Sequence, residues 1–408
     1  MYKLINYIKL LLCAMLCTIF IAGCNEEYPY NEIKEDEMPL RQLVGKYYGA
    51  QNFYVGMVPG ESKFFDAINN YYRLLFTNQF SVISIDTALN QEFLLKEPRA
   101  QFNDILYRPY FSTARQYNLS IYAKSSVSKK TSAWLSDTNN KLNTTENVRF
   151  MLTNIIKRLS NDFQANKDVV GWMEVVDSPF NTKSSSNVFA LNPWFQLGDS
   201  EIGFQEGSTT VIIPEYIILS LQLANQHAPD VKKIISQDGE LNMMLVERMK
   251  NLLLTLRNAG MRIDGIAWNA NFQYDISGVG FAWTKPDAIA ANEKILGEFI
   301  DWCYRNRFEF HLSSIELELQ NLDQDFGLTN EFAVEVTRDE QKAVLQSFMS
   351  VILPRVGRGV STIQFNGFND IIPETGIDGI KPRLFDVNNN PTPLYQELRN
   401  LLSKQINN

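Results

Sequence analysis

Cysteine is scarce in this chain. Its 408 residues include four cysteines, and three of them, Cys13, Cys17 and Cys24, lie near the N-terminus. The fourth, Cys303, lies in an amphipathic helical pattern with no histidine close to it in the sequence, so we expect a buried structural thiol rather than a nucleophile. If Cys13 and Cys17 are removed with a leader and Cys24 is modified, as argued below, no internal disulfide can form in the mature chain.

Histidine and positive charge are also in short supply. The two histidines, His227 and His311, are too few for a histidine-rich zinc site, so no metal site is expected. Lys and Arg total 38 against 46 Asp and Glu, which gives a net charge of −8. A protein that binds nucleic acid needs a basic face, so we do not expect this class of partner.

The apolar run at the N-terminus is short. Leu10–Ile21 follows a positively charged start and is too short for a comfortable membrane span. It ends in Ile21-Ala22-Gly23-Cys24, which resembles the bacterial lipoprotein signal, where the peptide is cleaved before the cysteine and that cysteine carries the lipid. We therefore expect residues 1–23 to be a signal peptide and Cys24 to be lipidated; an ordinary signal peptide or membrane anchor is the alternative.

The residues that follow Cys24 are acidic. Asn25, Glu26 and Glu27 resemble the export signal of surface lipoproteins in Bacteroidetes-type bacteria. Residues 24–40 are acidic and contain proline, which is typical of a flexible tether. These features predict a lipid-anchored protein of the cell envelope, in the outer membrane and exposed at the surface.

Residues 41–408 have the size and pattern of one α/β domain. About 370 residues are normal for an α/β barrel with insertions, and an apolar content of 45% is enough for a sizeable core. Eight β-rich runs alternate with helical patterns, and eight parallel strands close a barrel, so the predicted fold is α/β, a (β/α)8 TIM barrel; an open parallel sheet is the alternative. The candidate strands are Tyr47–Val55, Phe80–Ile85, Leu119–Ala123, Val169–Val176, Lys233–Ser236, Ile263–Ala267, Phe310–Leu319 and Thr362–Phe365. The candidate helices are Phe64–Leu75, Arg99–Gln116, Thr145–Gln164, Thr209–Gln226, Leu241–Ala259, Asp287–Asn306 and Arg338–Val356.

One predicted strand ends in a polar turn. Val169–Val176 contains two β-branched pairs, and Asp177-Ser178-Pro179 follows it. Sites in parallel α/β folds are built at the C-terminal ends of the strands. Asp177 and Ser178 are therefore the first candidates for chemistry.

Several motifs occur in an order that resembles one enzyme family. They are Asn192-Pro193-Trp194-Phe195-Gln196, Gly260–Ile266, Ile363–Asp370, and Arg383–Asp386 followed by Pro391–Tyr395. Together they resemble glycoside hydrolase family 10, the endo-β-1,4-xylanases, which are (β/α)8 barrels. The resemblance covers nearly the whole body of the chain and implies a xylan-like polysaccharide as ligand and no cofactor.

The resemblance places a serine at the acid/base position. Glu174–Pro179 is similar to the family's Asp-Val-Val-Asn-Glu-Ala/Pro, so Ser178 replaces the acid/base glutamate and Asp177 replaces the asparagine. A retaining glycosidase needs one carboxyl group as acid and a second as nucleophile, roughly 5–5.5 Å apart. A serine hydroxyl is too weakly acidic for the first role.

The nucleophile position has two possible registers. Ile315–Leu319 matches the family's Thr-Glu-Leu-Asp-Ile and makes Glu316 the candidate nucleophile, whereas a shift of two residues places Ser314 there. Both registers face the same side of a strand, because side chains alternate with a period of two. Residue identity favours Glu316.

Other positions that contact sugar in the family also differ here. Ala123 and Ser128 stand where the family has histidines, although the tryptophan that follows them, Trp134, is kept. The remaining positions that the resemblance assigns to sugar binding are Asp86, Asn269, Asn271 and Asn366. Since the scaffold motifs persist while the site changes, we infer that the hydrolytic role is lost or altered.

Aromatic residues could form the walls of a glycan cleft. The chain has 17 Tyr and 6 Trp, and such rings stack on the apolar faces of sugars. Trp134, Trp194, Trp268, Trp283 and Tyr274 lie on or after predicted strand ends and are the candidates. Ordinary packing of loop aromatics is the alternative for each of them.

Three functions are consistent with these features. The first is a surface lipoprotein that binds a polysaccharide through the barrel without cleaving it. The second is an active retaining endo-glycosidase of xylanase type, with Glu316 as nucleophile and a displaced acid such as Asp177, which would need a bulge to turn inward. The third is a structural partner of an outer-membrane glycan transport complex.

Overall fold

The computed structural model describes residues 35–60, 64–66, 70–182, 184, 187–273, 282–318, 330–369 and 383–404. Residues Pro39–Asn408 form one compact unit, and residues Met1–Met38 form another. The expected signal peptide, Cys24 and most of the expected tether lie outside the described residues. Within the described ranges, no helix is both long and apolar enough to cross a bilayer.

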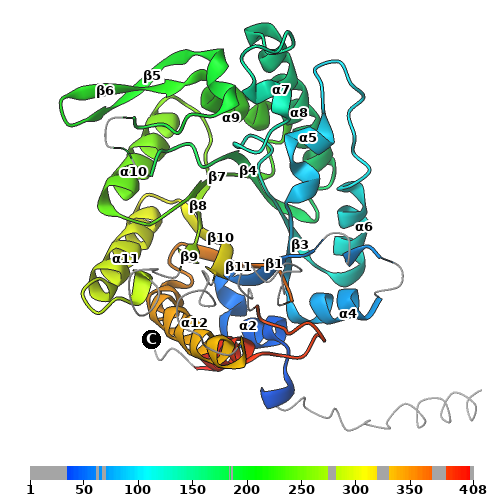
Figure 1. Cartoon of the computed structure of the whole chain (residues 1–408), viewed down its shortest axis with the longest axis vertical. Helices are drawn as coiled ribbons and strands as arrows, with labels where there is room; N and C mark the ends of the chain where they lie inside the picture. Colours follow the sequence, from blue (N-terminus) through cyan, green and yellow to red (C-terminus); the bar gives the residue numbers. More distant parts are fainter. Residues whose placement is uncertain are drawn as a thin grey trace, which may run out of the picture. The chain divides into compact units, whose positions relative to one another are not determined.

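The core of Pro39–Asn408 is a closed barrel of eight parallel strands (Figure 1). The strands are β1 (Tyr54–Val58), β2 (Val82–Ile85), β3 (Ser120–Ala123), β4 (Val170–Asp177), β7 (Lys232–Asp238), β8 (Gly265–Asn269), β10 (Glu309–Glu318) and β11 (Val360–Asn366). They pair in chain order, and β11 pairs with both β1 and β10, which closes the ring. The predicted TIM barrel is confirmed.

A ring of helices surrounds the barrel (Figure 1). These helices are α2 (Leu40–Tyr48), α4 (Asn70–Gln79), α5 (Gln91–Leu94), α6 (Arg108–Tyr117), α7 (Ala133–Ser136), α8 (Thr145–Ala165), α9 (Glu215–His227), α10 (Met243–Asn258), α11 (Ile289–Arg305), α12 (Asn330–Ile352) and α13 (Pro393–Ser403). A glycine follows the C-terminal end of α10, where Gly260 has a φ of 79° and its N–H donates to the carbonyl of Arg257.

Several predicted elements have the wrong type or start, among them the expected helix Arg99–Gln116, which begins only at Arg108. The expected strand Tyr47–Val55 begins only at Tyr54, since Tyr47 and Tyr48 end helix α2. The expected helix Thr209–Gln226 begins only at Glu215, because Thr209–Pro214 is strand β6. A run of β-branched residues favours a strand there. Strand β6 forms an antiparallel hairpin with β5 (Asp199–Glu206), which projects from the ring beside α9 and α10 (Figure 1).

The barrel interior is filled by large side chains. Tyr122 and His311 are fully buried, and Trp172 lies between 5.7 and 6.1 Å from their rings. Outside the barrel, Cys303 is fully buried on α11, and burial raises the pKa of its thiol. The prediction of a buried structural thiol is therefore confirmed.

Candidate functional site

A polar cavity lies at the C-terminal ends of the barrel strands. Its volume is about 260 Å³, and we call it the strand-end cavity. Its lining residues come from the ends of, or the loops after, most of the barrel strands: Asp86, Asn90, Lys124, Ser125, Ser128, Lys129, Lys130, Glu174, Asp177, Asp238, Asn269, Asn271, Ser314, Glu316 and Asn366. All of them are polar or charged, so the cavity can bind a ligand through hydrogen bonds and charges.

A bulge in β4 brings two carboxylates into this cavity. Glu174 pairs with Ile234 of β7 and Val176 pairs with Ile235, so two steps along β4 match one step along β7. In a regular strand, side chains three residues apart point to opposite faces. The bulge allows Glu174 and Asp177 to line the same cavity.

Glu174 forms a buried ion pair with Lys124. The Lys124 ammonium lies 3.2 Å from Glu174 Oε1, with side chains 8% and 1% exposed. The same ammonium donates to Asn269 Oδ1 at 3.2 Å, and Ser236 donates to Glu174 Oε2 at 2.9 Å. Every charge in this cluster therefore has a partner, as buried charges require.

Asp177 has its hydrogen bonds on one oxygen. Its Oδ1 accepts from Ser178 Oγ at 2.8 Å and from Asn269 Nδ2 at 3.1 Å, and it lies 2.9 Å from Ser236 Oγ, whose single proton is shared between Asp177 and Glu174. Burial, followed by the nearby negative charge of Glu174, raises the pKa of Asp177 from 3.8 to about 6, although the Ser178 hydrogen bond opposes the shift. A carboxyl group with this pKa can carry a proton in mildly acidic solution.

Ser178 does not line the cavity. It has a φ of 51°, in the left-handed region. Its N–H donates to Ser236 O at 2.8 Å, and its hydroxyl donates to Asp177 and accepts from the N–H of Asp238 at 3.1 Å. The side chain at the expected acid/base position thus supports Asp177 and orders the turn.

The two registers for the nucleophile position both reach the cavity. Strand β10 has an irregularity between Leu312 and Ile315 relative to β11, and both Ser314 and Glu316 line the cavity. Glu316 Oε1 accepts from the side-chain amide of Asn366 and lies 3.9 Å from the guanidinium of Arg383. The carboxylate of Glu316, rather than the hydroxyl of Ser314, therefore accepts the hydrogen bond from Asn366 and lies near the Arg383 guanidinium.

The structure brings most of the predicted polar site residues together. Asp86, Asn269, Asn271 and Asn366 line the cavity together with the two carboxylates. Sequence reasoning missed Lys124, Ser125, Lys129, Lys130 and Asp238. The signal for Lys124 and Asp238 was their position directly at the end of a strand, because any such residue points toward the mouth of a barrel.

The tryptophans expected to stack on sugars are packed in the interior. Trp194 is 0% exposed, Trp268 2% and Trp134 8%. Each indole N–H donates to a backbone carbonyl, from Ser128, Gly239 and Lys96, respectively. These rings leave no face for a ligand because neighbouring side chains already cover them. This correction also applies to Trp283, which is 7% exposed and donates to Ser347, whereas Tyr274 lies outside the described residues.

The part of the chain that the structure describes contains no cluster of three or more His, Cys, Asp or Glu side chains that could hold a metal ion. The strand-end cavity nevertheless contains carboxylates on several sides. Lys124 neutralises one of them, and amide groups bind others. Several of the carboxylates in the cavity are thus held by ion pairs or hydrogen bonds from other side chains of the protein.

Solved structures with this fold identify what the barrel is similar to. Xylanase 10B from Thermotoga petrophila, in complex with xylobiose, superimposes with a TM-score of 0.68 at 18% identity, over 90% of this chain and 98% of that one. The native xylanase 10B from Thermotoga maritima gives 0.66 at 18% identity, over 90% and 99%. The barrel has the fold of the family 10 xylanases.

A third example is fungal. The Penicillium canescens endo-1,4-β-xylanase matches this xylanase-like barrel with a TM-score of 0.67 at 17% identity, over 90% of this chain and 97% of that one. Neither a family model nor a curated protein sequence matches the chain. The relationship is therefore one of fold, and the chemistry of this xylanase-like barrel must be argued from its own residues.

Proposed function

We propose that this chain is a lipid-anchored surface protein whose xylanase-like barrel binds a xylan-like plant polysaccharide without cleaving it. The observation that carries the proposal is the strand-end cavity, whose lining residues are all polar and many of which already bind one another. Sugar hydroxyl groups both donate and accept hydrogen bonds, so carboxylates, ammonium groups and amides in one cavity match them. The fold adds support, because a structural neighbour holds xylobiose.

The absence of hydrolysis is argued from Ser178 and Glu316. The hydroxyl group of Ser178 is too weakly acidic to replace the acid. It donates a hydrogen bond to Asp177, and Ser178 itself does not line the cavity. Glu316 accepts a hydrogen bond from Asn366 and lies near the positive charge of Arg383. Its carboxylate is therefore suited to bind a sugar hydroxyl. The barrel therefore keeps a carboxylate for binding but lacks the standard pair of residues.

The lipid anchor on Cys24 and the acidic residues after it support a place on the outer surface of the outer membrane. A protein there could hold a glycan beside a transport complex of the same membrane. The described residues of the strand-end cavity include no aromatic ring, which favours a role as partner of such a complex over a cleft that captures long chains by stacking.

Product analysis tests this proposal. The full chain, in a detergent that carries no sugar, is incubated with xylo-oligosaccharides at high protein concentration beside a Glu316→Ala variant, and calorimetric titration measures binding. We expect binding without chain shortening, and weaker binding by Glu316→Ala. Shortening that disappears in the variant would contradict the proposal and make Glu316 a nucleophile.

A second candidate function is glycoside hydrolysis with a displaced acid. The β4 bulge, which such a mechanism requires, is present and places Asp177 in the same cavity as Glu316. The pKa of Asp177, about 6, is suitable for an acid near neutral pH. If this candidate is right, shortening is lost in Asp177→Asn and falls as the pH rises through about 6.

A further inference from the structure

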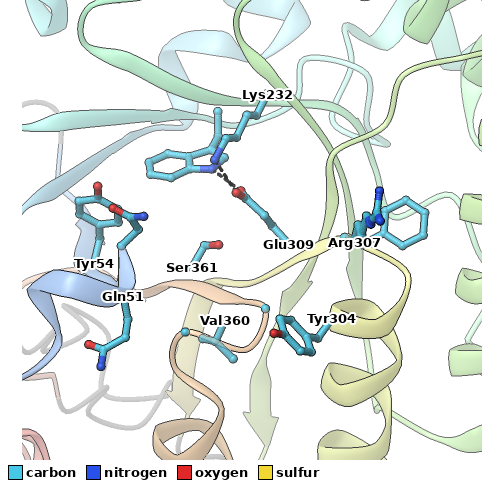
Figure 2. Close-up of a pocket in the computed structure, with 13 residues that line it drawn as sticks. Gln51, Tyr54, Lys232, Tyr304, Arg307, Glu309, Val360 and Ser361 are labelled. Atoms are coloured by element: carbon cyan, nitrogen blue, oxygen red, sulfur yellow. Dashed lines mark hydrogen bonds and ion pairs between the residues drawn. The ribbon is translucent and has the colours of Figure 1, made fainter.

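A second, larger pocket lies at the opposite end of the barrel (Figure 2). Its volume is about 610 Å³, within the range of small-molecule sites, roughly 300–1,000 Å³. Tyr54, Lys232, Glu309 and Val360 line it from the first residues of β1, β7, β10 and β11, and Trp172 lines it from β4. We call it the strand-start pocket.

An ion pair between Lys232 and Glu309 lies in this pocket. Lys232 contacts Glu309 Oε1, and the indole N–H of Trp172 donates to Glu309 Oε2 at 2.9 Å (Figure 2). The side chains of Lys232 and Glu309 remain 43% and 27% exposed. Burial alone would raise the pKa of Glu309, but His311 and Lys232 lower it to about 2, so the group is a carboxylate. A ligand therefore meets a positioned acceptor and a positioned donor.

The pocket is separated from the strand-end cavity. Tyr122, Ile234 and His311 are fully buried in the barrel behind Trp172. The rings of Tyr122 and His311 lie within about 6 Å of the Trp172 ring, at 6.1 and 5.7 Å. This layer of side chains fills the barrel between the two cavities, so a ligand in one does not reach the other.

One side chain of the pocket is an exposed aromatic ring. Tyr304 of α11 is 53% exposed and lines the pocket. Its Cβ lies close to Gly359, where φ is 102° and an added Cβ would lie 3.3 Å from Tyr304 Cβ. Trp172 is only 5% exposed and packs against Tyr54 with ring centroids 5.7 Å apart, so the exposed aromatic surface comes mainly from Tyr304. Figure 2 shows Tyr304 and Glu309 among the side chains that line the pocket.

We propose that the strand-start pocket is a second glycan-binding site, which holds one or two sugar rings by stacking on Tyr304 and by hydrogen bonds to Lys232 and Glu309. An exposed aromatic ring and a charged donor and acceptor in one pocket match a sugar, which has an apolar face and a rim of hydroxyl groups. Lys232 and Glu309 cancel in charge, and Arg307 adds a positive charge in the lining, so neutral and uronic-acid-bearing sugars both fit. The inference goes beyond the proposed function and does not depend on the strand-end cavity.

Calorimetric titration of the full chain tests the second site. The probes are xylotetraose and a xylotetraose that carries one glucuronic acid branch. We expect Tyr304→Ala to weaken binding at this pocket roughly three- to ten-fold, since a ring contact is lost, and Glu309→Gln to weaken it as well. The matched control is Tyr71→Ala, because Tyr71 is 66% exposed on α4, outside this pocket, and we expect it to bind like the wild type.

Glu316→Gln, in the strand-end cavity, separates this inference from the proposed function. Binding that Tyr304→Ala weakens and Glu316→Gln leaves unchanged supports the second site and counts against glycan binding at the strand ends. Binding weakened by Glu316→Gln alone overturns the second site and keeps the proposed function. The second site is also overturned if neither probe binds the wild type at millimolar concentration. Tyr304→Ala alters an exposed side chain, so we expect its melting temperature to equal that of the wild type, which would show that the fold is intact.

Discussion

The protonation of Asp177 links the strand-end cavity to pH. This carboxyl group lies beside Glu174 and receives its hydrogen bonds on Oδ1, and its pKa is about 6. In the unfolded chain the pKa returns to near 3.8, so folding takes up a proton between these two values. The contribution to stability is therefore fully present below pH 4 and is lost as the pH rises through about 6.

Asp177→Asn removes this dependence. The amide keeps an oxygen for the three donors and has no charge to desolvate, so we expect the variant to be more stable than the wild type at pH 7 by on the order of 2 kcal/mol, with little difference at pH 4. Urea unfolding between pH 4 and 8 measures this. Asp199→Asn, at an exposed position, serves as the control; equal stability of the Asp177 variant and the wild type at both pH values would contradict the assigned pKa.

The sequence indicated the position of some residues of the strand-end cavity and not of others. Asp86, Asn269 and Asn366 follow or end predicted strands, and position along a strand is enough to place such side chains at the barrel mouth. Lys124 has the same position, but a lysine after a strand is usually solvated. Its burial depends on Glu174, which is 50 residues away in the sequence, so no local sequence pattern indicates that Lys124 is buried.

At the scale of elements, two strands depart from regular pairing. The bulge in β4 turns Asp177 inward, and β10 is irregular between Leu312 and Ile315 relative to β11. A period-two pattern predicts which residues alternate but not where one strand gains a residue against its neighbour, because that depends on the partner strand. The strands were therefore predictable and their bulges were not.

The β5–β6 hairpin is attached to the barrel through Arg248. This residue of α10 is buried, its Nε donates to Glu206 Oε1 at 2.8 Å, and its Nη1 donates to the carbonyl of Ser184 at 3.0 Å. The helix expected from Thr209 was wrong because the apolar pattern of Thr209–Pro214 continues into α9 without a break. Propensity, which favours a strand for that β-branched run, was the better guide.

Glu206→Ala tests this attachment. The substitution removes the carboxylate that neutralises a buried guanidinium, so we expect the free energy of unfolding to fall by about 2 kcal/mol. Glu201→Ala, on the same strand at an exposed position, is the matched control and should change it by less than about 0.5 kcal/mol. Equal effects of the two substitutions in urea unfolding would mean that the ion pair does not stabilise the hairpin.

At the scale of the molecule, the two ends of Pro39–Asn408 are joined. Helix α2 packs against α13, and Gln79 Oε1 accepts from the N–H of Leu40 at 3.1 Å and from the hydroxyl of Tyr395 at 2.8 Å. Strand β11 completes the ring next to β1. Closure of the barrel therefore depends on contacts between residues that are far apart in the sequence. The ring of strands cannot close until both ends of the chain are in place.

Removal of α13 should prevent cooperative folding. Truncation before Pro393 deletes Leu394, Tyr395, Leu398 and Leu402, all nearly fully buried. Each contributes about 1.5–3 kcal/mol, and their sum is comparable with a typical stability of about 5–15 kcal/mol. Circular dichroism during heating should show no sharp transition, whereas truncation after Lys404 should leave the transition unchanged; a cooperative transition in the shorter chain would show that α13 is dispensable.

Alternation of strands and helices predicted a parallel α/β fold, and the count of eight strands favoured a barrel over an open sheet. The strand-start pocket was not predictable in this way. Its lining comes from the starts of β1, β7, β10 and β11 together with Tyr304 of α11, and no stretch of sequence shows that these positions leave a space. Cavities at the closed end of a barrel depend on side-chain packing rather than on pattern.

The left-handed backbone of Ser178 has a consequence for engineering this barrel as a catalyst. A glutamate at that position would lose the hydroxyl that both donates to Asp177 and accepts from Asp238, and its longer side chain would start from a conformation that non-glycine residues avoid. The single substitution Ser178→Glu would thus add a carboxyl group without directing it toward the glycosidic bond of a bound substrate. A designer would have to rebuild the β4 bulge and its turn together, because the backbone of this turn, and not the residue type alone, sets the direction of the side chain at position 178.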